Sequence, residues 1–531
     1  MKTGLKDALL AALSGLLMAL AAPLVIGCWT DLEIFQSQWW EALAWVALVP
    51  LFAVIRGRSW KTAFKAGTIA GLIYFSVVLY WIIVALTEFG HIPYVAAIPI
   101  LALLIVYCAL YWGAAAALTS YISAALGFRF TLVAPLVFTA LELVRNYALS
   151  GFPWGNIAYT QYKNLTIIQI ASIAGVYGVT FLLTMSSAVV FEWFSSGRRS
   201  HRPRPYGSLV LFSMLVAATF FWGMHRSTVI EQQSKDAPRI KVGVLQGNID
   251  QWRKSKSGEY RGSISSIYNR LTRTVVSSGV DLVIWPEAAY PVAVPEEIDS
   301  FDNEWSLLEP RKSTAHTLLG ASVYKIDPQV RRLHNSAFLL DQSYSVISRF
   351  DKTHLVPFGE YVPLGLPIEK LVSGVGVYTP GSSPVPQVFM RGNKTVKLGP
   401  LICYEGIFPE ISRELVNRGA NLMVNITNDA WYGVTSAPYQ HLSMYAFRSI
   451  ETGRYLARAA NTGVSAFIDP YGRINDRTKI FTEAAIVADL PLLETQTIYA
   501  RFGDLLAYAT LALVMLLLGA ALVIHRTKSA L

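Results

Sequence analysis

Charged residues are scarce in this chain of 531 residues, at 15% of the total, whereas hydrophobic residues make up 53%. Soluble domains usually carry about 25% charged residues, so the composition argues against a wholly soluble protein and for a membrane protein. The sequence also lacks a cluster of metal ligands and a phosphate-binding glycine loop of the G-x-x-x-x-G-K type. We therefore expect neither a metal nor another cofactor.

Cysteine is equally rare, with three residues in the whole chain. Cys28 and Cys108 lie in separate apolar segments at different depths, so no disulfide is expected between them. Cys108 is expected to pack inside a helix. Cys28 has two interpretations, because "LVIGC" ends either a retained first span or a cleaved lipoprotein signal. Cys403 is the only cysteine outside the hydrophobic ends of the chain.

The hydrophobic residues gather in residues 1–225 and 505–525. Apolar segments close to the length of about 20 residues that crosses a bilayer predict about eight transmembrane helices. These segments are residues 8–26, 39–56, 64–86, 92–122, 130–148, 166–193, 207–225 and 505–524.

The loops between these segments alternate in charge. Basic residues gather at the N-terminus, in 56–65, in 195–205 and in the tail 525–530, whereas the intervening loops carry hardly any. By the positive-inside rule both termini are then cytoplasmic, and the globular stretch lies on the periplasmic side. The net charge of +10 owes much to these loops. It implies contact with membrane lipids and requires no nucleic-acid partner.

The stretch between the hydrophobic ends has the pattern of an α/β domain. Strands that are mostly apolar on both faces alternate with helices, which favours sheets covered by helices. Strands are predicted at 239–248, 280–289, 317–324, 335–341, 345–352, 396–405, 421–430, 464–472 and 484–492, and helices at 259–279, 409–420 and 438–461.

Three residues of this stretch follow predicted strands, where α/β folds usually place their chemistry. They are Glu287 in "WPE", Lys352 in "FDK" and Cys403 in "LICYE". Singly, each has a simpler interpretation, as a solvated charge or a packed core cysteine. Together they divide one task, because a carboxylate can take the proton of a thiol while an ammonium favours the thiolate and holds an oxyanion.

A Glu–Lys–Cys trio in this order resembles the nitrilase (carbon–nitrogen hydrolase) superfamily and its α-β-β-α sandwich. The resemblance covers about 239–492 and includes "DKTHLVPFGEYVP" at 351–363 and "LICYEGIFPE" at 401–410. The helices at both ends extend it to the superfamily's membrane-embedded N-acyltransferases. The expected architecture is a membrane domain of transmembrane helices 1–7 in residues 1–225, a periplasmic nitrilase-like domain in 226–503, and helix 8 with a cytoplasmic tail in 504–531.

This resemblance implies an acyl transfer in a bacterial inner membrane. Cys403 would take a fatty acyl chain from the sn-1 position of a phospholipid, phosphatidylethanolamine being the expected donor, and form a thioester. The α-amine of an S-diacylglyceryl-cysteine at the N-terminus of an apolipoprotein would then receive the chain. Glu287 would be the base and Lys352 the oxyanion partner. The protein is expected to act as a monomer.

The resemblance also suggests supporting residues. Glu360 would orient Lys352 or share the role of base, while Tyr404 and Glu405 follow the nucleophile directly. A structural salt bridge is the alternative for Glu405. Residues 364–384 would form an apolar flap that protects the thioester from water, or a merely flexible loop. Candidate substrate-binding residues are Trp252, Asn335, Trp431, Phe152 and Trp154.

Two features qualify these substrate-binding candidates. Trp252 departs from the common pattern, because it comes early after "QGNI" at 246–249. Phe152 and Trp154 lie in a predicted periplasmic turn, and such aromatics are often plain interfacial belt residues.

Two other functions stay open from the sequence. One is a membrane-tethered amidase or nitrilase that hydrolyses a small soluble substrate, although one or two spans would suffice as a tether. The other is a transporter or scaffold with an inert domain, in which Cys403 would be dispensable and unreactive.

Overall fold

The computed structural model describes residues 2–24, 38–196, 203–302, 307–309, 313–326, 331–362 and 378–530. The chain forms two compact units. The first comprises Met1–Ile83, Pro93–Arg226 and Phe502–Leu531, and the second comprises Val84–Ile92 and Ser227–Arg501. The segment Val84–Ile92, which includes the ends of the predicted spans 64–86 and 92–122, thus belongs to the second unit.

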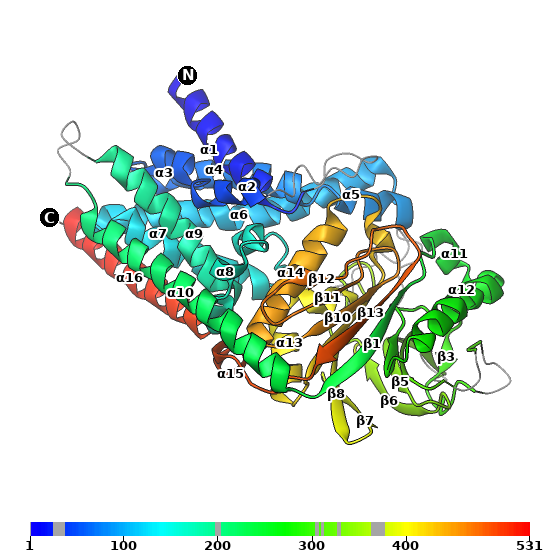
Figure 1. The fold of residues 1–531 in the computed structure, drawn as a ribbon. Helices are drawn as coiled ribbons and strands as arrows, with labels where there is room; N and C mark the ends of the chain where they lie inside the picture. The colour runs from blue at the N-terminus through cyan, green and yellow to red at the C-terminus, as the bar shows by residue number, and fades with distance from the viewer. Residues whose placement is uncertain are drawn as a thin grey trace. The chain divides into compact units, whose positions relative to one another are not determined.

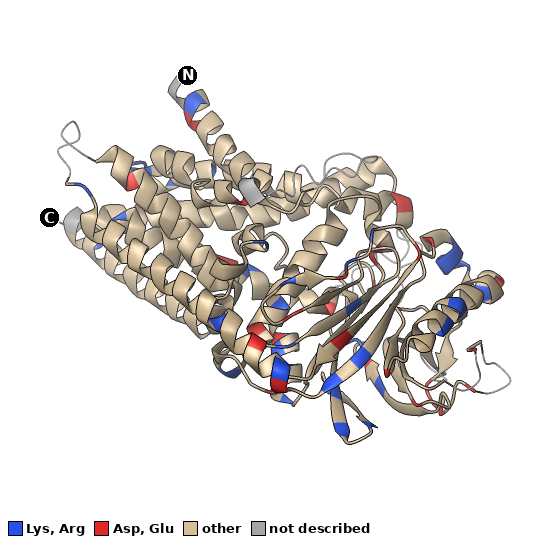
Figure 2. Cartoon of the chain, in the orientation of Figure 1, with Lys and Arg blue, Asp and Glu red and all other residues tan. Residues whose placement is uncertain are grey.

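The first unit is helical, and charged residues are sparse along its helices, as Figure 2 shows. Its elements, including those that extend into the second unit, are α1 (Lys2–Ala21), α2 (Gln38–Glu41), η2 (Ala42–Trp45), α3 (Val49–Ile55), α4 (Trp60–Val78), α5 (Ile82–Val84), α6 (Tyr94–Leu126), α7 (Phe130–Tyr147), η4 (Ile157–Gln161), α8 (Leu165–Ile168), α9 (Ala171–Ser195), α10 (Tyr206–Asp236), α15 (Ile498–Phe502) and α16 (Leu505–Ala530) (Figure 1).

Fewer helices than predicted are long and apolar enough to cross a membrane. Within the described residues α1, α6, α9, α10 and α16 meet that test, and α4 with Ile82–Phe89 makes a sixth if the pair, bent by 59°, is one span. The expected span at 39–56 is a shorter apolar helix, Ala42–Ile55. The expected span at 130–148 is α7, which is 18 residues long and contains two buried ionic side chains. The count of about eight transmembrane helices stays a prediction.

These two ionic side chains of α7, Glu142 and Arg145, hold the turn that follows the helix. Glu142 accepts hydrogen bonds from the Ile157 backbone N–H at 2.8 Å and from the Thr180 hydroxyl at 2.7 Å. Arg145 donates to the side-chain oxygen of Asn156. Buried ionic groups need such partners, because an unsatisfied charge in an apolar interior is costly. Both residues therefore fix the entry to η4.

The second unit contains two β-sheets (Figure 1). The first has the strand order β13-β1-β2-β4-β5-β6, with β3 paired to β4, and the second has the order β12-β11-β10-β9-β8-β7. The strands are β1 (Arg239–Gln246), β2 (Leu282–Ile284), β3 (Val294–Pro295), β4 (His316–Ile326), β5 (Arg331–Leu340), β6 (Val346–Asp351), β7 (Gln387–Arg391), β8 (Lys394–Ile402), β9 (Leu422–Thr427), β10 (Leu456–Ala460), β11 (Ala466–Ile468), β12 (Ile474–Asn475) and β13 (Ala484–Pro491).

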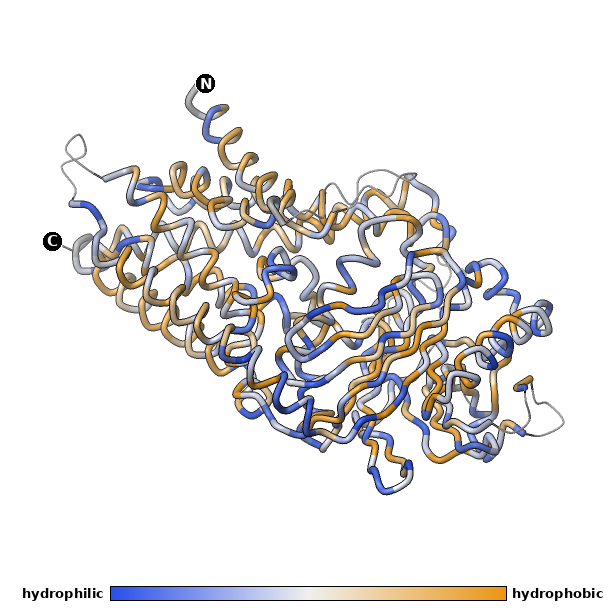
Figure 3. Tube along the Cα trace, in the orientation of Figure 1, coloured by the Kyte–Doolittle hydropathy of each residue, from blue (hydrophilic) through white to orange (hydrophobic). Residues whose placement is uncertain are grey.

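Helices cover the outer face of each sheet. The first sheet packs against α12 (Ser257–Ser277), which follows the short α11 (Gln251–Ser255), and the second packs against α13 (Pro409–Asn417) and α14 (Ala437–Thr452). Figure 3 shows hydrophobic residues along the strands, as expected for sheets buried on both faces. The predicted α-β-β-α sandwich is therefore confirmed.

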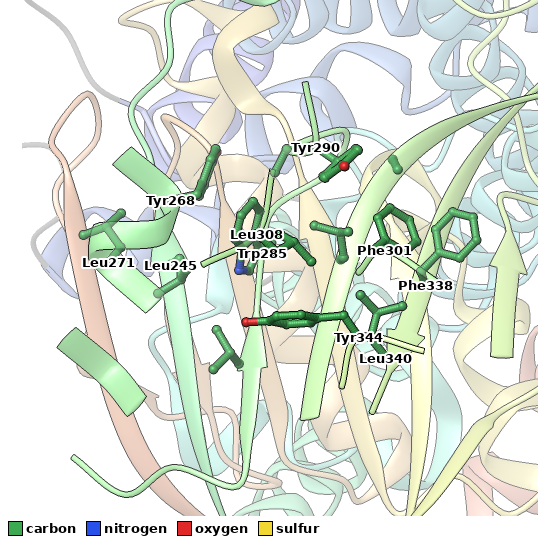
Figure 4. Close-up of a cluster of buried hydrophobic side chains, with 14 of the residues drawn as sticks. Leu245, Tyr268, Leu271, Trp285, Tyr290, Phe301, Leu308, Phe338, Leu340 and Tyr344 are labelled. Atoms are coloured by element: carbon green, nitrogen blue, oxygen red, sulfur yellow. The ribbon is translucent and has the colours of Figure 1, made fainter. Parts of the chain in front are cut away.

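An aromatic cluster in the first sheet and α12 fixes the end of β2 (Figure 4). The ring of Trp285 stacks on Tyr268 with centroids 4.8 Å apart. Its indole N–H donates a hydrogen bond to Thr272 at 3.1 Å. Trp285 is 2% exposed and lies two residues before Glu287. Its packing therefore fixes the backbone from which the Glu287 side chain extends.

The helix predicted at 438–461 is too long. The helix α14 ends at Thr452, and Gly453 follows with φ of 67°, a left-handed conformation that commonly ends helices. The rest of the predicted helix, Leu456–Ala460, forms β10, the strand between β9 and β11. All five residues of β10 are buried. A fully buried strand shows no alternation of apolar and polar residues, so the sequence pattern wrongly predicts that the helix continues through it.

Candidate active site

The three predicted catalytic residues come from three strand ends. Glu287 lies three residues after β2, Lys352 directly follows β6, and Cys403 directly follows β8. β2 runs parallel to β4, and β6 runs in the same direction because two antiparallel pairings separate it from β4. Glu287 and Lys352 therefore emerge at the same edge of the first sheet, while Cys403 comes from the second.

The structure brings these side chains together in a buried position. The Lys352 ammonium nitrogen lies 3.7 Å from Oε1 of Glu287. Both charges act on the Cys403 thiol, whose pKa responds to each of them. All three residues are buried, with exposures of 7% for Glu287, 1% for Lys352 and 8% for Cys403.

The Glu287 carboxylate is held by hydrogen bonds from two other segments. The Asn335 side-chain amide donates to Oε1 at 2.7 Å, and the Asn428 backbone N–H donates to Oε2 at 2.8 Å. Gly320 of β4 allows the Glu287 segment to lie this close, since a Cβ at Gly320 would come within 2.3 Å of the Pro286 carbonyl oxygen. Both carboxylate oxygens thus have fixed positions.

Lys352 is bonded to a second carboxylate. Its ammonium donates to Oε1 of Glu360 at 2.8 Å, and Glu360 is held in turn by the Val356 backbone N–H at 2.8 Å. Burial by itself lowers the pKa of Lys352, but the carboxylates of Glu360 and Glu287 outweigh it and raise that pKa above its usual value. Lys352 therefore stays a cation at all ordinary pH values.

Cys403 has an unusual backbone conformation for a residue other than glycine, with φ of 51°. It begins η8 (Cys403–Ile407), and the Tyr445 hydroxyl of α14 donates to its carbonyl oxygen at 2.7 Å. Gly406 leaves room for that tyrosine, because a Cβ at Gly406 would come within 2.1 Å of the Tyr445 ring. The hydrogen bond from Tyr445 thus stabilises the strained backbone conformation of Cys403.

The Cys403 thiol is protonated at rest. Burial raises its pKa to about 12; the Glu287 carboxylate adds to the rise, and the Lys352 ammonium opposes it. A thiol in this state is a weak nucleophile, because the thiolate is the reactive form. The site therefore needs a base that accepts the proton as the sulfur attacks.

The two residues after Cys403 have different surroundings. Glu405 is fully buried and accepts hydrogen bonds from the Thr353 backbone N–H at 2.6 Å and the Ile402 backbone N–H at 2.7 Å. Glu405 thus joins the loop after Lys352 to the end of β8 through backbone N–H groups and the Thr353 hydroxyl, and it has no salt bridge within the described residues. Tyr404 is 7% exposed and packs edge-on against Phe408.

A buried polar network around Asp429 was not predicted from the sequence. Asp429 accepts hydrogen bonds from Arg458 at 2.7 Å and from Thr427 at 2.9 Å, and its carboxylate lies 3.1 Å from the His441 ring. Burial alone would raise the pKa of Asp429, but Arg458 and His441 outweigh it and lower that pKa to about 2. The only sequence signal was polar residues within apolar strands, such as Thr427 in "NITND".

The proposed substrate-binding residues lie in different places. Asn335 is 6% exposed and bridges the two carboxylates, since it also reaches Glu360 at 3.2 Å. Trp252 of α11 and Trp431 are partly open, at 56% and 40% exposed, and the Trp431 ring contacts that of Phe89. Their roles stay predictions.

The two aromatic candidates from the predicted periplasmic turn belong to the first unit. Trp154 is 1% exposed, and its ring packs against Trp81 with centroids 4.7 Å apart. Phe152 is half-buried. The flap expected at 364–384 falls largely outside the described residues, as does Cys28.

Within the described residues, no group of three or more histidine, cysteine, aspartate or glutamate side chains is placed to hold a metal ion. The groups gathered at this site are a thiol, carboxylates and an ammonium. Such a set can run a covalent acyl transfer, in which the thiol carries the acyl group, a carboxylate moves the proton and the cation holds the oxyanion.

Comparison with known proteins agrees with both units. Residues 14–189 match the apolipoprotein N-acyltransferase N-terminal domain, and residues 241–500 match the carbon–nitrogen hydrolase family. The apolipoprotein N-acyltransferase of Geobacter metallireducens is 38% identical to this chain over 96% of it and 94% of the relative. The chain belongs to the apolipoprotein N-acyltransferase family.

Other members of the family are similar over comparable lengths. The apolipoprotein N-acyltransferase of Gloeobacter violaceus is 33% identical over 90% of this chain and 89% of its own, and that of Pasteurella multocida is 30% identical over 91% and 92%. Membership in an N-acyltransferase family, together with the apolar helices of the first unit, makes this chain a membrane-bound enzyme.

Proposed function

We propose that this N-acyltransferase moves a fatty acyl chain from the sn-1 ester of a phospholipid to the α-amine of an S-diacylglyceryl-cysteine at the N-terminus of an apolipoprotein. Phosphatidylethanolamine is the proposed donor. The proposal rests on one observation: in a chain of this family, the side chains of Cys403, Glu287 and Lys352 are buried and lie close together.

The first half of the reaction forms a thioester. The Cys403 thiol gives its proton to the Glu287 carboxylate while the sulfur attacks the ester carbonyl carbon. The tetrahedral intermediate then expels the glycerol oxygen, which takes the proton back from Glu287. A lysophospholipid leaves, and no net proton is gained or lost.

The second half transfers the chain to nitrogen. The neutral α-amine attacks the thioester carbonyl carbon, and the carbon–sulfur bond breaks. Glu287 carries a proton from the nitrogen to the departing sulfur, so that the amide and the free thiol form together. Lys352, held positive by Glu360 and Glu287, stabilises the oxyanion in both halves.

The proposed location is a bacterial inner membrane, with both termini cytoplasmic and the second unit periplasmic. The alternation of basic loops with loops that hold hardly any basic residues supports this orientation. We further propose that the enzyme acts as a monomer, because one chain supplies all three groups of the trio. This reaction would be the last step of lipoprotein maturation.

A transfer assay tests the function against hydrolysis. The purified full-length enzyme receives phosphatidylethanolamine labelled in its sn-1 chain and a diacylglyceryl-cysteine peptide with either a free or an acetylated α-amine. We expect label on the free-amine peptide alone, with one lysophospholipid released for each chain transferred. Cys403→Ala should abolish transfer, and Cys108→Ala, which alters the buried cysteine of α6, should not.

Two results would contradict the proposal. One is label released mainly as free fatty acid whether or not the free-amine peptide is present, which would favour the amidase-like hydrolase. The other is transfer that survives in Cys403→Ala.

A further inference from the structure

The second half-reaction, as proposed above, starts from a neutral α-amine, and forming that amine from an ammonium releases a proton that the trio cannot absorb. An α-amine has a pKa of about 8, so at neutral pH most of the acceptor arrives as an ammonium and must lose a proton before it attacks. Glu287 then moves a second proton from nitrogen to sulfur and ends as it began. One proton for each turnover therefore needs another acceptor, and Lys352 is already a cation paired with carboxylates.

A second lysine lies at the site. The Lys254 side chain, in α11, donates a hydrogen bond to the backbone carbonyl oxygen of Glu287 at 2.6 Å. Its ammonium is stabilised by the Glu287 carboxylate. Lys254 thus contacts the backbone of the proposed base, whereas Lys352 lies beside its carboxylate.

The two lysines differ in their partners. Lys352 donates to the Glu360 carboxylate, whereas Lys254 donates to a peptide carbonyl and has no ion pair within the described residues. A neutral amine keeps N–H groups and can still donate to a carbonyl, with its lone pair left to accept a proton. Loss of the Lys254 proton therefore breaks no salt bridge.

The surroundings of Lys254 make its neutral form easier to reach than that of an exposed lysine. It lines a small pocket with mostly apolar neighbours, among them Ile249, Tyr268, Ala288 and Pro291. Burial lowers the pKa of Lys254 to about 8, and the Glu287 carboxylate opposes that shift. This value matches the ordinary pKa of an α-amine, as efficient proton transfer requires.

The titratable groups near Lys254 come from three other segments and from its own. Glu287 and Cys403 face it from the ends of β2 and β8, and the Tyr268 phenol of α12 lines the same pocket. Its own segment adds Arg253, which pairs with Asp250, and the exposed Lys256.

We propose that the Lys254 side-chain amine takes the proton from the acceptor's α-ammonium, so that the free amine can attack the Cys403 thioester. The nitrogen–hydrogen bond of the ammonium breaks, a new one forms on Lys254, and the lysine then releases the proton to water. Lys254 would serve the second half-reaction alone, because the first half releases no net proton.

Single-turnover discharge of the acyl-enzyme tests this role. The full-length wild type, Lys254→Met and Lys254→Arg are loaded with phosphatidylethanolamine and then given the diacylglyceryl-cysteine peptide at about pH 7 and about pH 9, on either side of the α-amine pKa. Hydroxylamine, which is largely unprotonated at neutral pH, serves as a second acceptor that needs no such proton transfer. Loading and discharge are followed by intact mass.

We expect both Lys254 variants to load, and to discharge to the peptide up to about 10-fold more slowly at about pH 7, because only about one-tenth of an α-amine with a pKa of about 8 is free there. The rate should recover at about pH 9, where the peptide amine is already free, and discharge to hydroxylamine should match the wild type. Lys241→Met is the matched control, because Lys241 also donates to a backbone carbonyl, that of Ser278, and should change nothing.

Several results would overturn the role of Lys254. A normal peptide rate in Lys254→Arg would mean that only the positive charge matters, because arginine cannot accept the proton. Equal slowing with peptide and hydroxylamine, or a failure of both variants to load, would point to a structural role. If the wild type loads and discharges and the variants do so at the same rates, the role of Lys254 is rejected and the thioester mechanism stands. If the wild type never loads, the thioester mechanism is rejected as well.

Discussion

Two lysines at one site have opposite environments, and this contrast defines the chemistry at the scale of single residues. Lys352 lies between the carboxylates of Glu360 and Glu287, at 2.8 and 3.7 Å, and stays charged. Lys254 bonds to a peptide carbonyl, and burial lowers its pKa to about 8. Pairs of titratable groups whose pKa values are pushed apart commonly divide acid and base roles.

The trio can be tested by two substitutions that keep size and remove function. Glu287→Gln cannot accept the thiol proton, and Lys352→Met cannot hold the oxyanion. We expect Glu287→Gln to lower the rate of acyl transfer by about 10²- to 10⁴-fold and Lys352→Met by about 10²- to 10³-fold. The measurement is the initial rate of labelled chain transfer to the free-amine peptide.

Matched controls for these variants lie elsewhere in the same domain. Glu296 and Lys325 form an ion pair at 2.8 Å that is partly exposed, so Glu296→Gln and Lys325→Met remove the same groups outside the site and should leave transfer unchanged. Near-normal transfer in Glu287→Gln or in Lys352→Met would remove that residue from the mechanism.

Single residues of the site were predictable where chemistry and position coincided. Glu287, Lys352 and Cys403 follow strands and have complementary chemistry, which is visible along the sequence. Asp429 and Arg458 were not found, because their contact joins residues 29 positions apart through the order of strands in the second sheet. Only the fold reveals that such polar residues satisfy one another in a buried position.

At the scale of elements, patterns with a clear period were predicted well. The strand at 239–248 and the helix at 259–279 correspond to β1 and α12. The helix at 438–461 was overextended, because fully buried segments such as β10 have no polar face to reveal their period. Several apolar segments likewise formed shorter or broken helices, so hydropathy alone did not fix the number of spans.

Membrane orientation is a prediction about these elements. Reporter fusions at residues 60 and 528 should give cytoplasmic signals, and fusions at 240 and 400 should give periplasmic signals, because the basic loops stay on the inner side. At residue 400, a phosphatase fusion that is active only in the periplasm should be active, and a reporter that works only in the cytoplasm should be inactive. A cytoplasmic signal at 400 would contradict it, since the catalytic domain would then face away from the proposed acceptor.

At the scale of the whole molecule, two units with different compositions make one family member. The first unit is built of apolar helices, and the second carries a nitrilase-like sandwich with a buried thiol. A thioester in such a chain must survive until its second substrate arrives, because water is a competing acceptor. A stable acyl-enzyme is thus the central requirement of the proposed reaction.

Intact mass measurement of the full-length enzyme with phospholipid alone tests this requirement most directly. We expect the mass to rise by one fatty acyl group, the adduct to map to the peptide containing Cys403, and neutral hydroxylamine to remove it. Cys403→Ala should gain no adduct, while Cys108→Ala should gain it as the wild type does. An adduct that forms equally well in Cys403→Ala, or none in the wild type, would contradict the thioester.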